Sequence, residues 1–136
     1  MRIIGHGIHI VETKGIAKLM QAGEEYLAQR FTSEEFDLAR RGNGRMELFL
    51  AGRHAAKEAM VRALGHNNTG DAHWTADGNI VWTDIEVLQD QNRMPTVRLC
   101  NGIKEESLRM GIRLWIVRIS NAETCTIASA IATDGT

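Results

Sequence analysis

The longest segment with one consistent pattern of hydrophobic and polar positions covers residues 43–65, NGRMELFLAGRHAAKEAMVRALG. Its apolar positions recur at spacings of seven, four and three, which places them on one face of a helix: Phe49, Ala56, Met60 and Ala63. Asn43 can cap the start of this helix through its side-chain oxygen, and Gly65 suits the left-handed position just beyond the end. We predict that the rest of the chain is organised around this helix.

Charged residues lie between the apolar rows of the same helix. Arg53 and Lys57 are four residues apart, and His54, Glu58 and Arg62 follow one another at the same spacing, so each set lies in line along the helix. Residues 40–62 hold six Lys or Arg and two Asp or Glu, a local charge of +4. A solvated face with weak ion pairs produces this pattern, and so does a basic surface for a phosphate-rich ligand.

Residues 2–11 have the alternation of a strand. Ile4, Ile8 and Ile10 are expected on one face, and the other face carries Gly5, Gly7 and His9. Because glycine has no side chain, that second face can approach another backbone or a ligand closely.

The remaining pattern predicts further helices and strands. We expect a helix over residues 14–29 that Gly23 weakens, and a short helix from Thr32 or Ser33 to Leu38. Strands are expected at 80–87 and 96–99, a helix at 101–110, and a hairpin from 114–119 and 124–132. This order of elements predicts an α+β domain, with an antiparallel sheet packed on the long helix.

Composition narrows the possibilities. A chain of 136 residues is expected to form a single domain over residues 1–136, and a net charge of −1 excludes a generally basic nucleic-acid binder. Cys100 and Cys125 are too few for a disulfide framework and too isolated for a zinc motif. No apolar run has the length of a membrane span, and no signal-peptide pattern is present, so we expect a cytoplasmic protein without a membrane partner.

Five stretches of the sequence resemble one known family. FLAGRHAAKEA at residues 49–59 resembles the signature FLAGRxAAKEA of holo-acyl-carrier-protein synthases, the small bacterial 4′-phosphopantetheinyl transferases. Four shorter matches follow the family's order: GIHIVE at 7–12, FTSEE at 31–35, WTDIEV at 82–87 and ISN at 119–121. The resemblance covers most of the chain, which is therefore identified as a member of this family.

The resemblance implies a fold and a reaction. Members of the family transfer 4′-phosphopantetheine from coenzyme A to a serine of an acyl carrier protein and release adenosine 3′,5′-bisphosphate, a step that supports fatty acid biosynthesis. They commonly form homotrimers with the active site between subunits, and they use Mg²⁺. The expected fold is thus phosphopantetheinyl transferase-like, and the expected partners are coenzyme A, an acyl carrier protein and two further copies of the chain.

Matching the motifs residue by residue assigns roles in this sequence. Glu58 matches the carboxylate that binds the metal, and we also expect it to be catalytic with Lys57 and Asn121. The coenzyme A contacts are expected from the basic rows and the glycine that follows them: Arg53, Lys57, Arg62 and Gly65.

Three positions depart from the family pattern. His9 stands in place of the aspartate that binds the metal together with the glutamate, Asn121 in place of a histidine near the reacting centre, and Gly15 in place of an arginine that docks the carrier protein. Imidazole suits Zn²⁺, Ni²⁺ or Cu²⁺ better than Mg²⁺, so the expected metal is Mg²⁺ on Glu58, or Mn²⁺ or another divalent ion if His9 is a ligand. Asparagine cannot take up a proton near neutral pH, so Asn121 can orient a water but cannot act as a base.

These departures leave two hypotheses open. In the first, the protein is a transferase with impaired or altered activity. In the second, it is a non-catalytic relative that binds coenzyme A, a nucleotide or a protein on the same trimeric scaffold. For His9 a structural reading also stays open, as a polar group on the glycine face that is hydrogen-bonded within the subunit interface. The remaining histidines have no partner at ligand spacing in the sequence and receive no role: His6, His54, His66 and His73.

Overall fold

A computed structural model of the chain describes residues 1–21, 23–42, 46–65 and 80–136. The elements follow one another as β1 (Ile3–Glu12), α1 (Thr13–Gln21), α2 (Glu24–Ala28), α3 (Ser33–Arg41), α4 (Met46–Ala63), a 3-10 turn η1 (Trp82–Asp84), β2 (Ile85–Gln89), β3 (Pro95–Leu99), α5 (Asn101–Arg109), β4 (Leu114–Asn121) and β5 (Cys125–Thr133).

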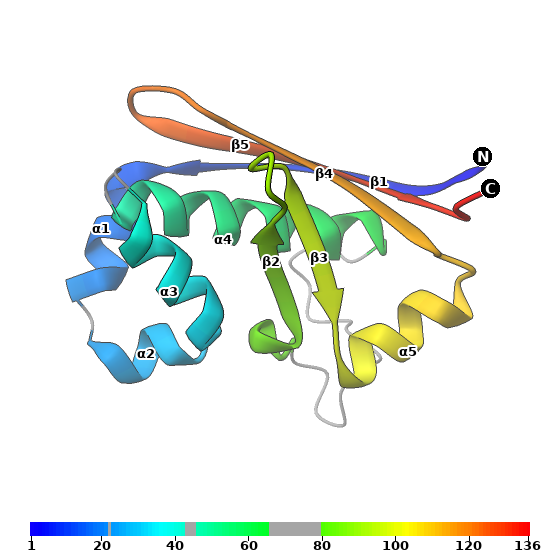
Figure 1. Cartoon of the computed structure of the whole chain (residues 1–136), viewed down its shortest axis with the longest axis horizontal. Coiled ribbons are helices and arrows are strands. Elements are labelled where there is room, and N and C mark those ends of the chain that lie inside the picture. The colour runs from blue at the N-terminus through cyan, green and yellow to red at the C-terminus, as the bar shows by residue number, and fades with distance from the viewer. Residues whose placement is uncertain (22, 43–45, 66–79) are drawn as a thin grey trace.

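The strands form two antiparallel sheets on the long helix α4. One sheet has the order β1-β5-β4, and the other is the β2-β3 hairpin. In Figure 1 α4 runs along the three-stranded sheet, α1, α2 and α3 gather at its N-terminal end, and α5 lies towards the other end of the sheet. The predicted α+β architecture, an antiparallel sheet packed on a long central helix, is confirmed.

The glycines of β1 allow α4 to lie directly against the sheet. A Cβ atom on Gly7 would overlap the carbonyl oxygen of Ala59, and one on Gly5 would overlap that of Ala63. Ala59 is fully buried and Ala63 nearly so. The prediction that this face of β1 approaches another backbone is therefore confirmed, and the alanines of α4 supply the matching small surface.

The opposite face of the three-stranded sheet exposes several large apolar side chains. Ile8 and Ile10 of β1 are 47% and 58% exposed, and Ile127 of β5, which pairs with Ile10, is 40% exposed. Ile4 was predicted to lie on this face with Ile8 and Ile10, but it does not. The register of β1 shifts between Ile3 and Gly5, and Ile4 instead contacts the buried core cluster.

Other differences from the predicted elements have local causes. The single helix expected at 14–29 is divided into α1 and α2, and Gly23 between them has φ 109°, which an α-helix cannot contain. Residues 82–84 form a 3-10 turn, so the strand expected from 80 starts only at Ile85. Gly65 has the predicted left-handed conformation with φ 87°. The Asn43 cap lies outside the described residues.

No helix in the described ranges is both long enough and apolar enough to cross a membrane.

Candidate active site

The two charged rows of α4 have different surroundings. Arg53 and Lys57 are almost completely buried, with 6% and 1% of their surface exposed. His54, Glu58 and Arg62, in the neighbouring row, are only partly buried. One helix therefore presents a buried charged row beside a row that solvent can reach.

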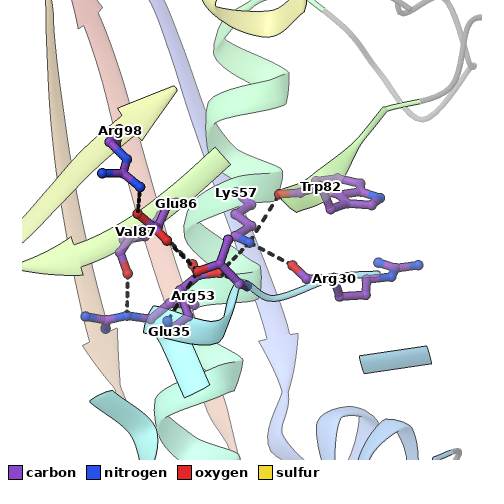
Figure 2. A network of polar contacts seen from close by, with 9 residues as sticks. Arg30, Glu35, Arg53, Lys57, Trp82, Glu86, Val87 and Arg98 are labelled. Atoms are coloured by element: carbon purple, nitrogen blue, oxygen red, sulfur yellow. Dashed lines mark hydrogen bonds and ion pairs between the residues drawn. The ribbon is translucent and has the colours of Figure 1, made fainter. Parts of the chain in front are cut away.

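Lys57 is held by three acceptors of its own chain (Figure 2). Its ammonium nitrogen Nζ donates to the backbone oxygen of Arg30 at 2.7 Å, to Oε1 of Glu35 at 2.8 Å and to the backbone oxygen of Trp82 at 3.2 Å. An ammonium group has three protons to donate, so these contacts use all of them. Burial lowers the pKa of Lys57, and the charge of Glu35 opposes that shift.

Glu35 connects this lysine to two other elements. Its Oε1 accepts from the backbone N–H of Thr32 at 2.9 Å, which completes a capping box at the start of α3, and its Oε2 accepts from the backbone N–H of Val87 at 3.0 Å. The hydroxyl of Thr32 donates to Oε2 of Glu86 at 2.6 Å, and Arg98 lies 3.2 Å from Oε1 of the same carboxylate. The network ties α3, α4 and the β2-β3 hairpin together.

Arg53 extends the same network along α4. Its Nε donates to the backbone oxygen of Val87 at 3.1 Å and its Nη2 to that of Leu88 at 3.2 Å, while the guanidinium lies 3.8 Å from the centre of the Phe49 ring. Burial lowers the pKa of Arg53 to about 10, with Glu35 opposing the shift. The predicted coenzyme A contacts of Arg53 and Lys57 stay predictions. In the structure, both side chains donate hydrogen bonds to acceptors of their own chain.

A second group of polar side chains lies on the row that solvent can reach. His9 of β1 and His54 of α4 meet edge to face, with ring centres 6.0 Å apart and planes inclined at 80°. Nε2 of His54 lies 4.0 Å from Oε1 of Glu58, one helical turn further on, and these two side chains are 13% and 14% exposed. We call His9, His54 and Glu58 the histidine–glutamate cluster.

Burial and neighbouring charges set the ionisation of this cluster. Burial lowers the pKa of His54 to about 4, and the positive charge of Arg30 acts in the same direction. Burial and Arg62 lower the pKa of His9. Burial raises the pKa of Glu58, whereas Arg62 and Arg30 oppose that rise. At neutral pH the cluster therefore contains two neutral imidazoles beside one partly buried carboxyl group.

Two guanidinium groups border the cluster. Nη1 of Arg62 donates to the backbone oxygen of Ile8 at 3.0 Å, which ties the end of α4 to β1. The guanidinium of Arg30 lies 5.5 Å from the centre of the Trp82 ring, and that ring lies 6.3 Å from His54. Gly65 follows α4 in an exposed position. This border supplies positive charge where an anionic ligand could approach Glu58.

Asn121 and Gly15 lie apart from the cluster. Asn121 ends β4, and its Oδ1 accepts from the hydroxyl of the buried Thr126 at 2.8 Å. Because β5 separates β4 from β1, Asn121 stands two strand spacings, about 10 Å, from the strand that carries His9. Gly15 is exposed on α1. Within the chain the structure places His54 between His9 and Glu58, with Arg62 close enough to affect the pKa of both His9 and Glu58, and it leaves Asn121 and Gly15 outside.

The sequence prediction missed His54, Arg30 and Trp82. The statement that His54 has no partner is wrong, because it lies against both His9 and Glu58. The four-residue spacing between His54 and Glu58 was the available signal, and it indicated only that the two share a helix face. The contact with His9 depends on the packing of α4 against β1, which no local pattern reveals.

The donor atoms of the cluster do not fit Mg²⁺. This ion prefers six oxygen ligands, whereas the cluster offers one carboxylate and two imidazoles. In the arrangement observed, no three His, Cys, Asp or Glu side chains of the described residues are placed to hold a metal ion. We therefore derive no step of a reaction through Mg²⁺.

Comparison with known proteins connects this chain to one group of enzymes. No protein-family model matches the chain. A holo-[acyl-carrier-protein] synthase from Alkaliphilus metalliredigens is 35% identical over 134 residues, which cover 96% of this chain and 99% of that protein. Among solved structures, the holo-[acyl-carrier-protein] synthase of Neisseria meningitidis has a TM-score of 0.80 at 24% identity, covering 97% of this chain and 99% of that one. A Bacillus anthracis holo-(acyl-carrier-protein) synthase in complex with CoA (3′,5′-ADP) has a TM-score of 0.72 at 25% identity, covering 96% of each chain.

Proposed function

Because the chain belongs to the holo-[acyl-carrier-protein] synthase family, we propose that it transfers 4′-phosphopantetheine from coenzyme A to a serine of an acyl carrier protein. The observation that carries this proposal is the match to a curated synthase at 35% identity over 96% of this chain and 99% of the relative. The position of Glu58 supports it, because the carboxyl group lies at a partly open site with arginines at its border.

The chemistry of the transfer assigns a role to each part of the site. The serine oxygen attacks the phosphorus that carries the pantetheine arm, the bond from that phosphorus to adenosine 3′,5′-bisphosphate breaks, and the serine proton leaves. Arg30 and Arg62 are suited to hold the pyrophosphate and to balance its charge. Glu58 is suited to accept the proton, directly or through a water, because its pKa is raised.

Lys57 has a different role in this proposal. Its three donors bind Arg30, Glu35 and Trp82, so it fixes the backbone on which the guanidinium of Arg30 and the ring of Trp82 are mounted. We therefore assign Lys57 to positioning, next to the residue that faces the substrate. The side chain of Asn121 cannot accept a proton at neutral pH, so its contribution would be to orient a water or the carrier protein.

Assembly as a homotrimer is part of the proposal. The isoleucines on the outer face of the three-stranded sheet, Ile8, Ile10 and Ile127, give a monomer a contiguous apolar surface of the kind that subunit interfaces cover. A trimer would also bring the polar ends of the strands of one subunit close to another. A cytoplasmic location and a part in fatty acid biosynthesis stay predictions.

The transferase is tested by intact-mass spectrometry of an apo-acyl carrier protein. The carrier protein is incubated with coenzyme A and this protein, in separate reactions with Mg²⁺, Mn²⁺ and Zn²⁺, and the Alkaliphilus metalliredigens synthase serves as the competent control. We expect the carrier protein to gain one phosphopantetheine group. If the carrier protein gains no phosphopantetheine in any of the three reactions while the control synthase modifies it, the result would favour the non-catalytic relative.

A repair experiment separates a damaged site from a diverged surface. Replacing His9→Asp together with Asn121→His restores the residues that the family has at these positions. If only the chemistry is impaired, this variant transfers faster than wild type with Mg²⁺. If it binds coenzyme A but stays inert, the surface that meets the carrier protein has changed as well, and Gly15 is the first position to examine.

A further inference from the structure

Two aromatic side chains hold the guanidinium group of Arg30. Its Nη2 donates to the hydroxyl of Tyr26 at 3.1 Å, and its central carbon lies 5.4 Å from the centre of the Tyr26 ring and 5.5 Å from that of Trp82. A guanidinium is attracted to aromatic rings because its positive charge interacts with their π-electrons. Tyr26 belongs to α2 and Trp82 to η1, so two separate segments of the chain fix one positive group.

The backbone that carries this group is fixed as well. Nζ of Lys57 donates to the backbone oxygens of Arg30 and Trp82, at 2.7 and 3.2 Å. Figure 2 shows the side chains of Arg30 and Trp82 on the same side of Lys57. Arg30 therefore loses less conformational freedom on binding a ligand than an unrestrained surface arginine does. A guanidinium held in this way is preorganised to bind an anion.

The charge of Arg30 is not paired within the part of the chain that the structure describes. The ion pairs found there join other side chains, such as Lys57 with Glu35 and Arg98 with Glu86. Among the same residues, Tyr26 is the one side chain that accepts a hydrogen bond from Arg30, which leaves most of the guanidinium donors for a ligand. Arg30 is partly buried, so an anionic partner would be little screened by water.

This charge also reaches the partly exposed row of α4. Burial lowers the pKa of His54, and Arg30 is the strongest of the charges that act in the same direction. Burial raises the pKa of Glu58, and Arg62 and Arg30 both oppose that rise. The ring of Trp82 lies 6.3 Å from that of His54. Glu58 is therefore within range of two guanidinium groups that come from different parts of the chain.

We propose that Tyr26 and Trp82 are positioning residues, which hold Arg30 in place to bind the pyrophosphate of coenzyme A. This inference rests on the proposed transferase function, which supplies coenzyme A as the ligand. A pyrophosphate offers negative charge and several acceptor oxygens, which a planar guanidinium can meet with two parallel N–H···O bonds. The pyrophosphate, and not the ribose phosphate, is the group expected here, because the phosphorus attacked by the serine must lie near Glu58 if Glu58 accepts the serine proton.

Calorimetric titration with coenzyme A, in the absence of a carrier protein, tests the role of Arg30. We expect Arg30→Met to bind coenzyme A at least tenfold more weakly than wild type. Arg30→Lys should lie between the two, since lysine keeps the charge but lacks the two parallel donors. Arg40→Met is the matched control. Arg40 also lies over an aromatic ring, that of Phe36 at 5.7 Å, but it is exposed on α3 and paired with Asp37, so its loss should leave the affinity unchanged.

The positioning residues are tested in the same titration. Tyr26→Phe removes only the hydroxyl that accepts from Arg30, and Trp82→Leu removes an aromatic ring, so each should weaken the binding of coenzyme A severalfold. Trp82→Phe should restore most of the loss, because a phenyl ring can still contact the guanidinium. A purely structural role would instead appear as a lowered urea midpoint, which we expect to stay close to that of wild type in Tyr26→Phe.

Dephospho-coenzyme A, which lacks the ribose 3′-phosphate, identifies the group that Arg30 contacts. If Arg30 binds the pyrophosphate, Arg30→Met should weaken the binding of both ligands by the same factor. A loss that appears only with coenzyme A would assign Arg30 to the 3′-phosphate and overturn the proposal. An unchanged affinity for coenzyme A together with a raised KM for the carrier protein would place the contact on the protein partner and overturn it as well.

The titration separates this inference from the proposed transferase. Affinities equal to that of wild type in Arg30→Met, or in both Tyr26→Phe and Trp82→Leu, would overturn the inference and leave the transferase standing. Weaker binding in these variants would support the inference even if wild type failed to modify a carrier protein. A wild type that does not bind coenzyme A would overturn both.

Discussion

Lys57 and Glu35 form an ion pair of 2.8 Å inside the protein, with 1% and 0% of their side chains exposed. The pair joins α4 to α3, and through Glu35 it reaches the backbone of Val87 in β2 (Figure 2). The side chain of Glu58, the next residue on α4, is instead only partly buried and lies 4.0 Å from Nε2 of His54. Lys57 and Glu58 are adjacent in one motif, yet Lys57 lies in the interior and Glu58 belongs to the candidate site.

Loss of the lysine is expected to damage folding. Lys57→Met removes the partner of a buried carboxylate, and breaking such a pair costs about 3–5 kcal/mol because the remaining charge stays buried. Equilibrium unfolding in urea measures this loss. The double variant with Glu35→Leu should recover part of it, since no uncompensated charge remains. A Lys57→Met protein as stable as wild type would contradict the structural role.

The contact between β1 and α4 depends on the absence of a side chain at Gly7. A Cβ in Gly7→Ala would overlap the carbonyl of Ala59, and separating the helix from the sheet should cost about 1–3 kcal/mol or more. Gly15→Ala is the matched control, because a Cβ there meets nothing within 4 Å and alanine favours a helix, so stability should rise by about 0.5–1 kcal/mol. Equal effects of the two substitutions would refute the close approach.

The buried imidazole makes stability depend on pH. The pKa of His54 is about 4 in the folded state against 6.5 for the free side chain, so the unfolded chain binds the proton first and stability falls as pH drops between these values. His54 should account for a loss of about 2 kcal/mol between about pH 7 and pH 5. Urea unfolding without metal at both pH values checks this. The pH dependence should shrink by that amount in His54→Phe, and an unchanged slope would count against the burial of His54.

The trimer can be tested through the apolar face of the sheet. Ile10→Asp places a charge at a side chain that is 58% exposed in one subunit, so it should prevent association while leaving the fold intact. Size-exclusion chromatography with light scattering should show a trimer for wild type and a monomer for the variant. Leu108→Asp, on α5, serves as the control because Leu108 is 46% exposed on another element. A wild-type protein that is monomeric at all concentrations would exclude the trimer.

Much of the fold could be predicted from the sequence because its signals are local. The spacing of apolar residues on α4, the capping residues of α3 and the glycines of β1 each depend on neighbours within one element. Where the prediction failed, the cause was equally local. Gly23 interrupted a helix instead of weakening it, and a register shift in β1 moved Ile4 to the core.

The site could be predicted only in part because its contacts join distant segments. Lys57 meets a backbone oxygen and a carboxylate at positions 30 and 35, and only the folded chain shows that these acceptors use its donors. His54 became a candidate site residue only through its contact with His9, which depends on the packing of β1 on α4. Sequence likeness supplied Glu58 and Arg62, whereas the partners of each charged row required the structure.

The central claim is that Glu58 faces the reaction while Lys57 supports the fold, and one comparison tests it. Wild type, Glu58→Gln and Lys57→Met are assayed by intact mass for the transfer of phosphopantetheine to the same apo-acyl carrier protein, and the urea midpoint of each protein is measured in parallel. We predict transfer by wild type, a loss of at least a hundredfold in Glu58→Gln with stability close to that of wild type, and a lowered urea midpoint in Lys57→Met. Unimpaired transfer by Glu58→Gln, or an unchanged midpoint in Lys57→Met, would contradict the account.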